Sequence, residues 1–338
     1  MRFFTKAILF LLFTILSLGL NNLQAEQSVV FEGKLDNFSR HSYYNCVEKI
    51  FSAYEAEYKK IKLGKFKKVA LKVYTNSGAG LATPTALVEA VIIELEKRGY
   101  ERKNIAIVDI NRQKLRDSGF LPKYGELKAG LADNFKDCPV YDLDSGKYFD
   151  DDWFYDNQMP AKVSLYATQE HRYSLSSENM RKSYLPVPLF LNVDFWINLP
   201  VATDMESIKI SGALANASIW NMSNNERFFS ATANAPIAVA EVMAIPELKE
   251  SLLLNIMSFE HIQVIGGSVF NHAYVASDKK LIASADPCVI DRIAFDFLNI
   301  HRKRKGFDFI EELPVVFEYC KQVEVGQYDL SKVKFKAL

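Results

Sequence analysis

One segment, residues 68–99, constrains the fold more than any other part of the chain. Apolar residues alternate along residues 69–73, which predicts a strand. A polar loop that contains glycine follows over residues 75–80. Thr83 and Pro84 are typical of a helix start, because the hydroxyl can cap free N–H groups and the proline ring fixes a helical φ. The helix itself is predicted from apolar positions at helical spacing and a terminal glycine, namely Leu87, Val88, Val91, Ile92, Leu95 and Gly99.

A second predicted strand, residues 104–109, turns this segment into a strand–helix–strand unit. Such a unit places its strands in parallel, joined by a right-handed crossover. The sequence therefore predicts an α/β fold, with a mostly parallel sheet and helices on both faces. Ligands tend to bind where the carboxyl ends of such strands meet helix N-termini. With 49% hydrophobic residues, the chain can bury a large core.

The N-terminus has the character of a targeting segment. Arg2 and Lys6 precede a mainly apolar run over residues 7–20, which is shorter than the ~20 residues that span a bilayer. Ala25 offers a cleavage site, so residues 1–25 are interpreted as a signal peptide and the mature protein as exported, periplasmic or secreted. An uncleaved N-terminal anchor is the alternative.

No later apolar run is long enough to span a membrane, and a net charge of zero does not favour a nucleic-acid partner.

The remaining chain divides by pattern into three parts. Residues 26–65 form an N-terminal extension with an amphipathic helix over residues 43–60. Residues 66–306 form the α/β domain, and residues 307–338 form a tail with a helix near residues 309–316 and irregular structure beyond. Within the domain, further helices are predicted over 113–118, 210–220, 237–257 (interrupted near Pro246) and 288–303, and further strands over 140–144, 193–199, 260–265 and 280–283. A hairpin is predicted within 160–190.

Cys46, Cys138, Cys288 and Cys320 are the four cysteines. No two of them form a C-x-x-C motif, which argues against a local zinc or iron–sulfur site. We interpret them as buried thiols or one disulfide, which an exported protein can form, and the pairing stays open.

Three blocks together resemble domain-of-unknown-function family 362. They are residues 69–99, residues 197–216 and residues 281–291, the last reading S-x-D-P-x-x-x-D at the head of a helix. The resemblance covers residues 66–300 and implies an α/β fold; some members of that family carry ferredoxin-type iron–sulfur modules.

The chain departs from the family pattern in the middle block. The family reads Leu-Pro-x-x-Lys-x-His and then Thr-x-x-x-Lys-Asn. Leu199, Pro200 and Asn216 match that pattern, whereas the other positions carry Thr203, Met205, Ser211 and Ala215. Three candidate chemical groups, two lysines and a histidine, are therefore missing, as are the ferredoxin cysteines.

The candidate site residues lie in these blocks. Lys72, Asp286 and Asp291 are the predicted catalytic groups, because buried charges need partners or a metal. The Asp286 carboxylate has a second interpretation as a helix cap. The predicted ligand-binding residues are Asn76, Gly78, Gly80, Thr83, Ser211 and Asn216.

Weaker candidates complete the site prediction. The loop is close to a dinucleotide fingerprint with Asp109 as ribose ligand, but the third glycine is missing. Asp150, Asp151 and Asp152 form either a solvated loop or a cation site. His261 and His272 are the next candidates, as metal ligands or bases.

Two functional hypotheses stay open. In the first, the exported protein binds a small anionic ligand, metal or cofactor at the carboxyl edge of the sheet, as a redox-type enzyme. In the second, it is a catalytically silent binding or scaffold protein that keeps the fold and lacks the family's lysine and histidine groups. The reaction, the cofactor, the metal and the oligomeric state are left open.

Overall fold

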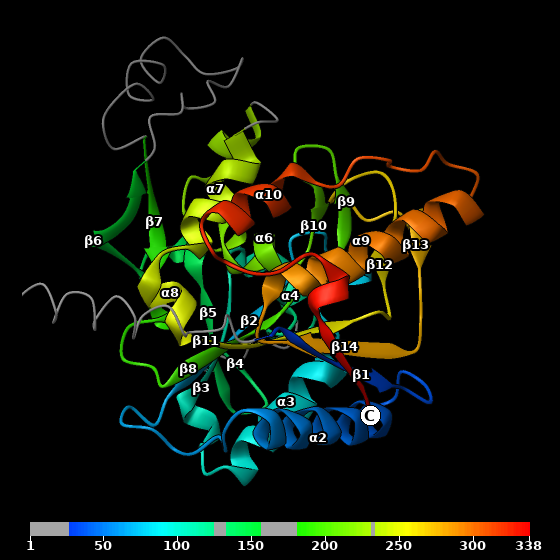
Figure 1. The fold of residues 1–338 in the computed structure, drawn as a ribbon. Coiled ribbons are helices and arrows are strands. Elements are labelled where there is room, and N and C mark those ends of the chain that lie inside the picture. The colour runs from blue at the N-terminus through cyan, green and yellow to red at the C-terminus, as the bar shows by residue number, and fades with distance from the viewer. Residues whose placement is uncertain (1–26, 125–132, 157–180, 231–233) are drawn as a thin grey trace, which may run out of the picture.

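A nine-stranded sheet organises the molecule (Figure 1). The computed structural model describes residues 27–124, 133–156, 181–230 and 234–338. The strand order is β15-β1-β14-β11-β8-β2-β3-β5-β4. The strands are β1 Val29–Lys34, β2 Val69–Val73, β3 Ile105–Asp109, β4 Asn134–Phe135, β5 Cys138–Asp142, β8 Phe195–Leu199, β11 Leu252–Ser258, β14 Lys280–Ser284 and β15 Lys334–Ala337. The neighbours from β11 to β5 are all parallel, as are β1 and β15, whereas β14 is antiparallel to both of its neighbours and β4 to β5.

Helices cover both faces of this sheet, so the predicted α/β fold class is confirmed. The helices are α2 Arg40–Glu57, α3 Thr85–Lys97, α4 Arg112–Asp117, α6 Ala213–Ala217, α7 Asn234–Met243, α8 Pro246–Ser251, α9 Pro287–Arg304 and α10 Val315–Gln322. Alternating strand residues separate two apolar layers. Leu71 and Ile197 pack with α2, α3 and α4, whereas Ala70 and Trp196 pack with α6, α7 and α9. Figure 1 shows α2 and α3 below the sheet and α6, α7, α9 and α10 above it.

Two small sheets lie outside the main one. The first contains β10 Lys209–Ser211, β9 Thr203–Met205, β12 Ile262–Gln263 and β13 Val275–Ala276. The second pairs β6 Phe149–Asp156 with β7 Lys182–Pro186. Asp150, Asp151 and Asp152 are exposed on β6, and no cluster of three metal-ligating side chains occurs among the described residues. Much of the predicted 160–190 hairpin lies outside those residues, because 157–180 are not described.

Several predicted elements differ from the structure. Residues 252–258 form the strand β11 rather than the end of a helix, and the predicted 210–220 helix is split into β10, the short α6 and a 3₁₀ turn, Ile219–Asn221. The tail helix is α10, later than the predicted 309–316, and the chain then enters the sheet as β15.

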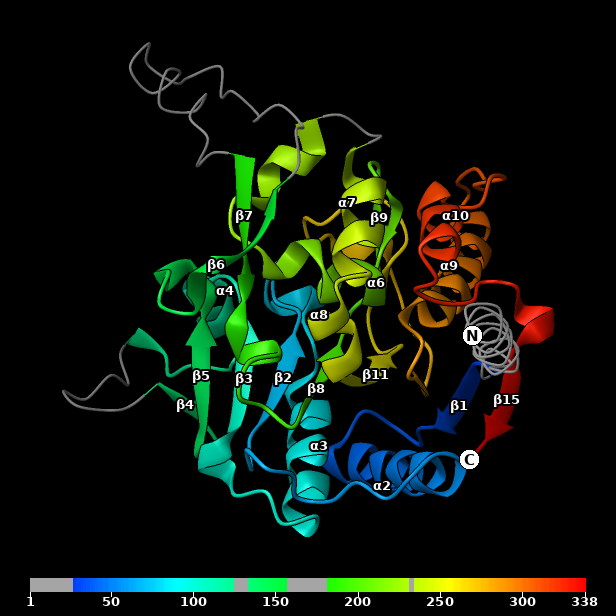
Figure 2. The ribbon, with the colours of Figure 1, turned by 60° about the vertical axis from the view of Figure 1, so that its left-hand side comes forward.

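The ends of the described chain lie side by side. Figure 2 shows β1 next to β15, and the backbone N–H of Lys334 donates to the carbonyl of Ser28 at 2.9 Å. The main sheet therefore takes strands from both segments outside residues 66–306. The predicted signal peptide, residues 1–25, lies outside the described residues. None of the helices in the described part combines the length and the hydrophobicity needed to cross a bilayer.

Candidate functional site

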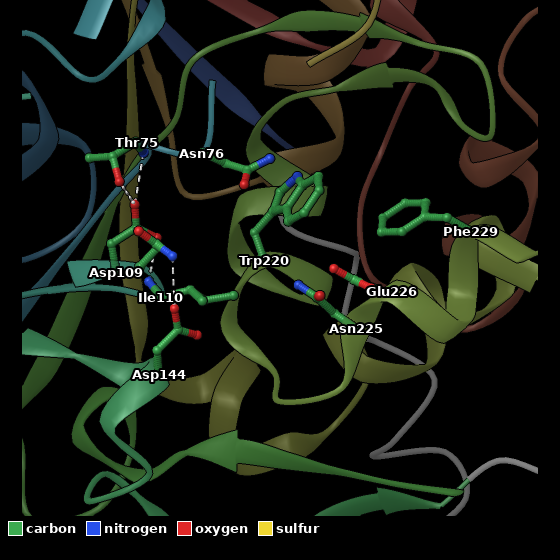
Figure 3. A pocket seen from close by; sticks show the side chains of 10 residues that line it. Thr75, Asn76, Asp109, Ile110, Asp144, Trp220, Asn225, Glu226 and Phe229 are labelled. Atoms are coloured by element: carbon green, nitrogen blue, oxygen red, sulfur yellow. Dashed lines mark hydrogen bonds between the residues drawn. The ribbon is translucent and has the colours of Figure 1, made fainter. Parts of the chain in front are cut away.

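A pocket of about 320 Å³ lies beyond the carboxyl ends of β2, β3 and β5. Its first wall follows these strands and contains Thr75, Asn76, Asp109, Ile110, Asn111 and Asp144. Its second wall comes from the segment after α6 and contains Trp220, Asn225, Glu226 and Phe229. Figure 3 shows the two walls facing each other, with Trp220 on the side of the second wall that faces Asp109. The edge predicted from the strand–helix–strand unit is therefore where the pocket lies.

Asp109 connects the pocket to a buried cation. Lys72 is fully buried, and its Nζ donates to Asp109 Oδ1 at 2.7 Å, to Asn216 Oδ1 at 2.8 Å and to the carbonyl of Val73 at 2.5 Å. Burial lowers the pKa of Lys72, and the charge of Asp109 opposes that shift. Because these bonds use all three ammonium hydrogens, Lys72 has none left for a ligand. Lys72, a predicted catalytic residue, and Asn216, a predicted ligand-binding residue, are thus brought together, but behind the pocket wall.

A chain of buried asparagines continues from Asn216 across the sheet. Asn216 Nδ2 donates to Asn198 Oδ1 at 2.7 Å, and Asn198 Nδ2 donates to Asn255 Oδ1 at 2.8 Å. Asn255 Nδ2 then donates to the carbonyl of Ser284 at 3.0 Å. Sequence reasoning missed Asn198 and Asn255. An asparagine within an otherwise apolar strand was the available signal, because a buried amide needs partners.

The polar loop after β2 is held by Asp109. The backbone N–H and the hydroxyl of Thr75 both donate to Asp109 Oδ2, at 2.7 and 2.6 Å. This places Asn76 in the pocket wall, in agreement with its predicted position. Gly78 has φ +86° and precedes a 3₁₀ turn, and a Cβ at Gly80 would lie 2.3 Å from the Phe270 ring. Neither glycine lines the pocket, so their roles are in the turn.

Thr83 does not cap α3, contrary to the sequence prediction. The helix begins at Thr85 with Pro84 at the N-cap and no side-chain cap. The Thr83 hydroxyl instead accepts from the N–H of Tyr74 at 2.8 Å and donates to the carbonyl of Leu199 at 2.6 Å. It joins the ends of β2 and β8, because a buried hydroxyl takes the partners that its position offers.

The two predicted catalytic aspartates stand apart from Lys72. Asp286 accepts from the N–H groups of Cys288 and Val289, at 2.8 and 3.3 Å, so its predicted capping role is confirmed. Asp291 accepts from the N–H groups of Ala213 and Leu214, the latter at 3.0 Å. Burial raises the pKa of Asp286 and raises that of Asp291 to about 7. Within the described residues, neither carboxylate shares a hydrogen bond or ion pair with Lys72.

Ser211 contributes to the pocket through its contact with Trp220. Its hydroxyl accepts from the indole N–H of Trp220 at 2.8 Å, which orients the ring that forms the second wall. Trp220 stacks on Phe229 with ring centroids 5.3 Å apart and planes 25° apart. His261 and His272 lie away from this pocket, half-buried and exposed respectively.

The pocket lining is acidic and rich in amides. Asp109, Asp144 and Glu226 contribute carboxyl groups, and no lysine or arginine is among the lining residues that the structure describes. The Asn111 side chain donates to Asp144 Oδ2 at 3.0 Å. Burial raises the pKa of Asp144, and the charges of Asp109 and Asp142 add to that effect. The lining therefore offers carboxyl and amide groups for hydrogen bonding.

Comparisons with known proteins found no relative from which the family or the function of this chain can be inferred. No family model matches the chain, and no curated protein matches it. Among solved structures, a crystal structure of a protein from Thermotoga maritima is similar over 86% of this chain, with 12% identity and a TM-score of 0.38. The chain spans about 60% of the length of that protein. At this TM-score the likeness says nothing about fold or function.

Proposed function

We propose that this protein binds a small, uncharged, hydroxyl-rich ring, such as a sugar, in the pocket beyond β2, β3 and β5. The observation that carries the proposal is that the second wall contains two aromatic rings, whereas the first wall contains mainly polar side chains. Trp220 and Phe229 offer stacked aromatic surface, onto which the C–H face of a sugar ring packs. Carboxylates accept hydrogen bonds from hydroxyl groups, and asparagine amides both donate and accept them. A few placed polar groups in a partly apolar hollow are typical of ligand sites.

The charge of the lining favours this ligand over an anion. Asp144 and Glu226 would repel a phosphate or carboxylate, and the charges of Lys72 and Asp109 compensate each other. The anionic ligand expected from the sequence is therefore the less favoured choice. A hydroxyl-rich ligand needs no counter-charge.

The location of the protein and its family are also part of the proposal. The basic residues, apolar run and cleavage site of residues 1–25 support export of the protein. The three sequence blocks support a divergent member of domain-of-unknown-function family 362. Thr203, Met205 and Ala215 stand where that family carries lysine, histidine and lysine, which supports a binding role over the family's own chemistry.

A thermal-shift panel tests the ligand class. Neutral mono- and disaccharides should raise the melting temperature, because a ligand that binds only the native state adds about 2.7 kcal/mol at 100 times its Kd. The corresponding sugar phosphates and uronic acids should have a smaller effect. The opposite order, with acidic sugars stabilising and neutral sugars inert, would refute the proposal.

Variants of pocket residues test whether the ligand binds in this pocket. Phe229→Ala should weaken sugar binding at least tenfold in calorimetry, because it removes half of the stacked aromatic surface. Glu226→Gln should improve binding of acidic sugars relative to neutral ones, because it removes a repelling charge. Glu312→Gln, a matched change of an exposed glutamate outside the pocket, is the control and should change neither.

Hydrolysis of a glycoside is the second candidate function. The observation that favours it is that Asp144 and Glu226 line the same pocket and that burial raises the pKa of Asp144, as in the general acid of a glycosidase. Chromogenic aryl glycosides test it. Release of the aryl group that Asp144→Asn abolishes, with sugar binding retained, would support it.

A further inference from the structure

Two of the four cysteines lie against one another where α9 meets α10. Cys288 is in the first turn of α9 and Cys320 in the last turn of α10, and neither has any exposed surface. The side chain of Cys320 is a hydrogen-bond partner of the Cys288 thiol. This contact is the largest cause that raises the pKa of Cys288 above its ordinary value, followed by burial. The two sulfur atoms are therefore neighbours in one apolar layer.

The backbone that follows α10 fixes this arrangement. The N–H of Val325 donates to the carbonyl of Cys320 at 2.8 Å, which turns the chain back toward α9. Gly326 then lies so near that a Cβ there would be 2.8 Å from the Cβ of Cys288. The next N–H, of Gln327, donates to Asp286 Oδ2 at 2.7 Å. Contacts on both sides of the thiol pair thus hold the end of α10 on the start of α9.

The other two cysteines have no such neighbour. Both lie in the apolar layer on the opposite face of the sheet, which separates them from Cys288 and Cys320. Cys46 lies on α2, against Gly33 of β1, and Cys138 lies in β5. β1 and β5 are six positions apart in the sheet, which is roughly 29 Å at about 4.8 Å per strand. Cys46 and Cys138 therefore cannot pair with each other in the folded chain.

We propose that Cys288 and Cys320 are a redox site, which oxidation converts into a disulfide that fastens α10 to α9. Two S–H bonds break and one S–S bond forms. The two protons and two electrons reduce one molecule of a small disulfide, such as oxidised glutathione, to two thiols. The bond closes a loop that contains the exposed segment between the two helices, so it removes conformational freedom from the unfolded chain.

Burial sets the kinetics of this site. The thiolate is the reactive form, and the environment of Cys288 disfavours it. Oxidation in the folded state should therefore be slow and should speed up when mild denaturant opens the α9–α10 contact. Once formed, the disulfide should resist reduction by glutathione for the same reason.

Peptide mapping tests the pairing. The purified protein is equilibrated in buffers of graded oxidised and reduced glutathione, its free thiols are alkylated under denaturing conditions, and it is digested without reduction. We expect a cross-linked peptide pair that contains Cys288 and Cys320, with Cys46 and Cys138 alkylated. Alkylation of all four cysteines at every glutathione ratio, or a cross-link through Cys46 or Cys138, would overturn the proposal.

Stability gives a second readout. Oxidised protein should melt roughly 5–10 °C above reduced protein, given the usual entropic effect of closing a loop of this size. Cys320→Ser should remove the difference between the two forms, and Cys46→Ser, the matched change of a buried thiol, should preserve it. Equal melting temperatures for fully cross-linked and fully reduced wild-type protein would contradict the fastening role. Neither measurement depends on the pocket ligand, so the two proposals fail separately.

Discussion

The ammonium group of Lys72 joins three segments that the sequence keeps far apart. It binds Asp109 at the end of β3 and Asn216 in α6, while its own strand β2 lies at the centre of the sheet. A fully buried cation is tolerable only where acceptors replace the water that it has lost. Those acceptors also fix Asp109, which in turn holds Thr75 and the pocket loop.

Replacement of Lys72 by methionine should therefore be costly. The change leaves Asp109 buried without its counter-charge and Asn216 Oδ1 without a donor, so unfolding in urea should show a loss of about 3–5 kcal/mol. The double variant Lys72→Met/Asp109→Asn should lose less than the single variant, because no charge is then left unpaired. A double variant as unstable as the sum of the two single variants would contradict this account.

Asp291 should make stability depend on pH. Its pKa is about 7 in the folded chain and about 3.9 when unfolded, so between these values only the folded state holds the proton. The folded state then binds more protons, and its stability falls as pH rises, by roughly 1.4 kcal/mol per pH unit at most from this group. The contribution is fully present below pH 4 and lost above pH 7. The melting temperature of wild type minus that of Asp291→Asn should fall as pH rises from 4 to 8, and a constant difference would refute the assignment.

Part of one wall of the candidate site could be predicted from the sequence. Asn76 and Asp109 follow strands whose carboxyl ends must meet at one edge, and that rule places them correctly. Trp220, Glu226 and Phe229 come from a segment more than 100 residues later, and no periodic pattern links that segment to β2. Asp286 and Asp291 were chosen for chemistry, and the structure assigns both to backbone N–H groups at helix starts.

Among the elements, those with sustained periodicity were predicted well. α3 and α9 have long apolar stripes, and β2, β3 and β8 have strict alternation or bounding turns. β11 was missed because its sequence LLLNIMS is a short apolar run, which fits a buried strand as well as a helix. β1 and β15 were missed because short edge strands carry little pattern, and the sheet partners that define them are distant in sequence.

The junction of α6 with α9 depends on one close approach. A Cβ at Gly212 would lie 2.2 Å from Asp291 Oδ1, so Gly212→Ala must displace the carboxylate from the N–H groups at the start of α6. We expect a loss of about 2–4 kcal/mol in denaturant unfolding, from two buried N–H groups left without acceptors. Gly267→Ala is the control: φ is +72° there, but nothing lies within 4 Å, so only about 1 kcal/mol of backbone strain is expected. Similar losses at both positions would contradict the role of Asp291.

On the scale of the whole molecule, the pocket and the β15 edge lie on different parts of the sheet. Among the described strands, β15 pairs only with β1, and Lys334 Nζ also binds Glu57 of α2 at 2.9 Å. The pocket lies at β2, β3 and β5, at least four strands farther along. Stability of the edge and binding in the pocket should therefore be separable.

Deletion of residues 334–338 should separate them. The truncated protein should melt at a lower temperature and scatter light on heating, because an unpaired β1 offers an open edge to other chains. Its affinity for the pocket ligand should stay within a factor of two or so at temperatures where it is folded. Lys334→Ala keeps the strand and loses one exposed ion pair, so it should cost less than about 1 kcal/mol. Loss of ligand affinity in the folded truncated protein would show that the two regions are coupled.

The pairing of β1 also determines when the main sheet can form during synthesis of the chain. Its two neighbours in the sheet are β14 and β15, and β15 leaves the ribosome roughly 300 residues after β1. At about 5–20 residues per second, the first strand waits roughly 15–60 s for its last partner. Until β14 is made, roughly 250 residues after β1, neither of these partners exists, so β1 is an unpaired strand that is available to chaperones. The native sheet can close only after β15 has been made.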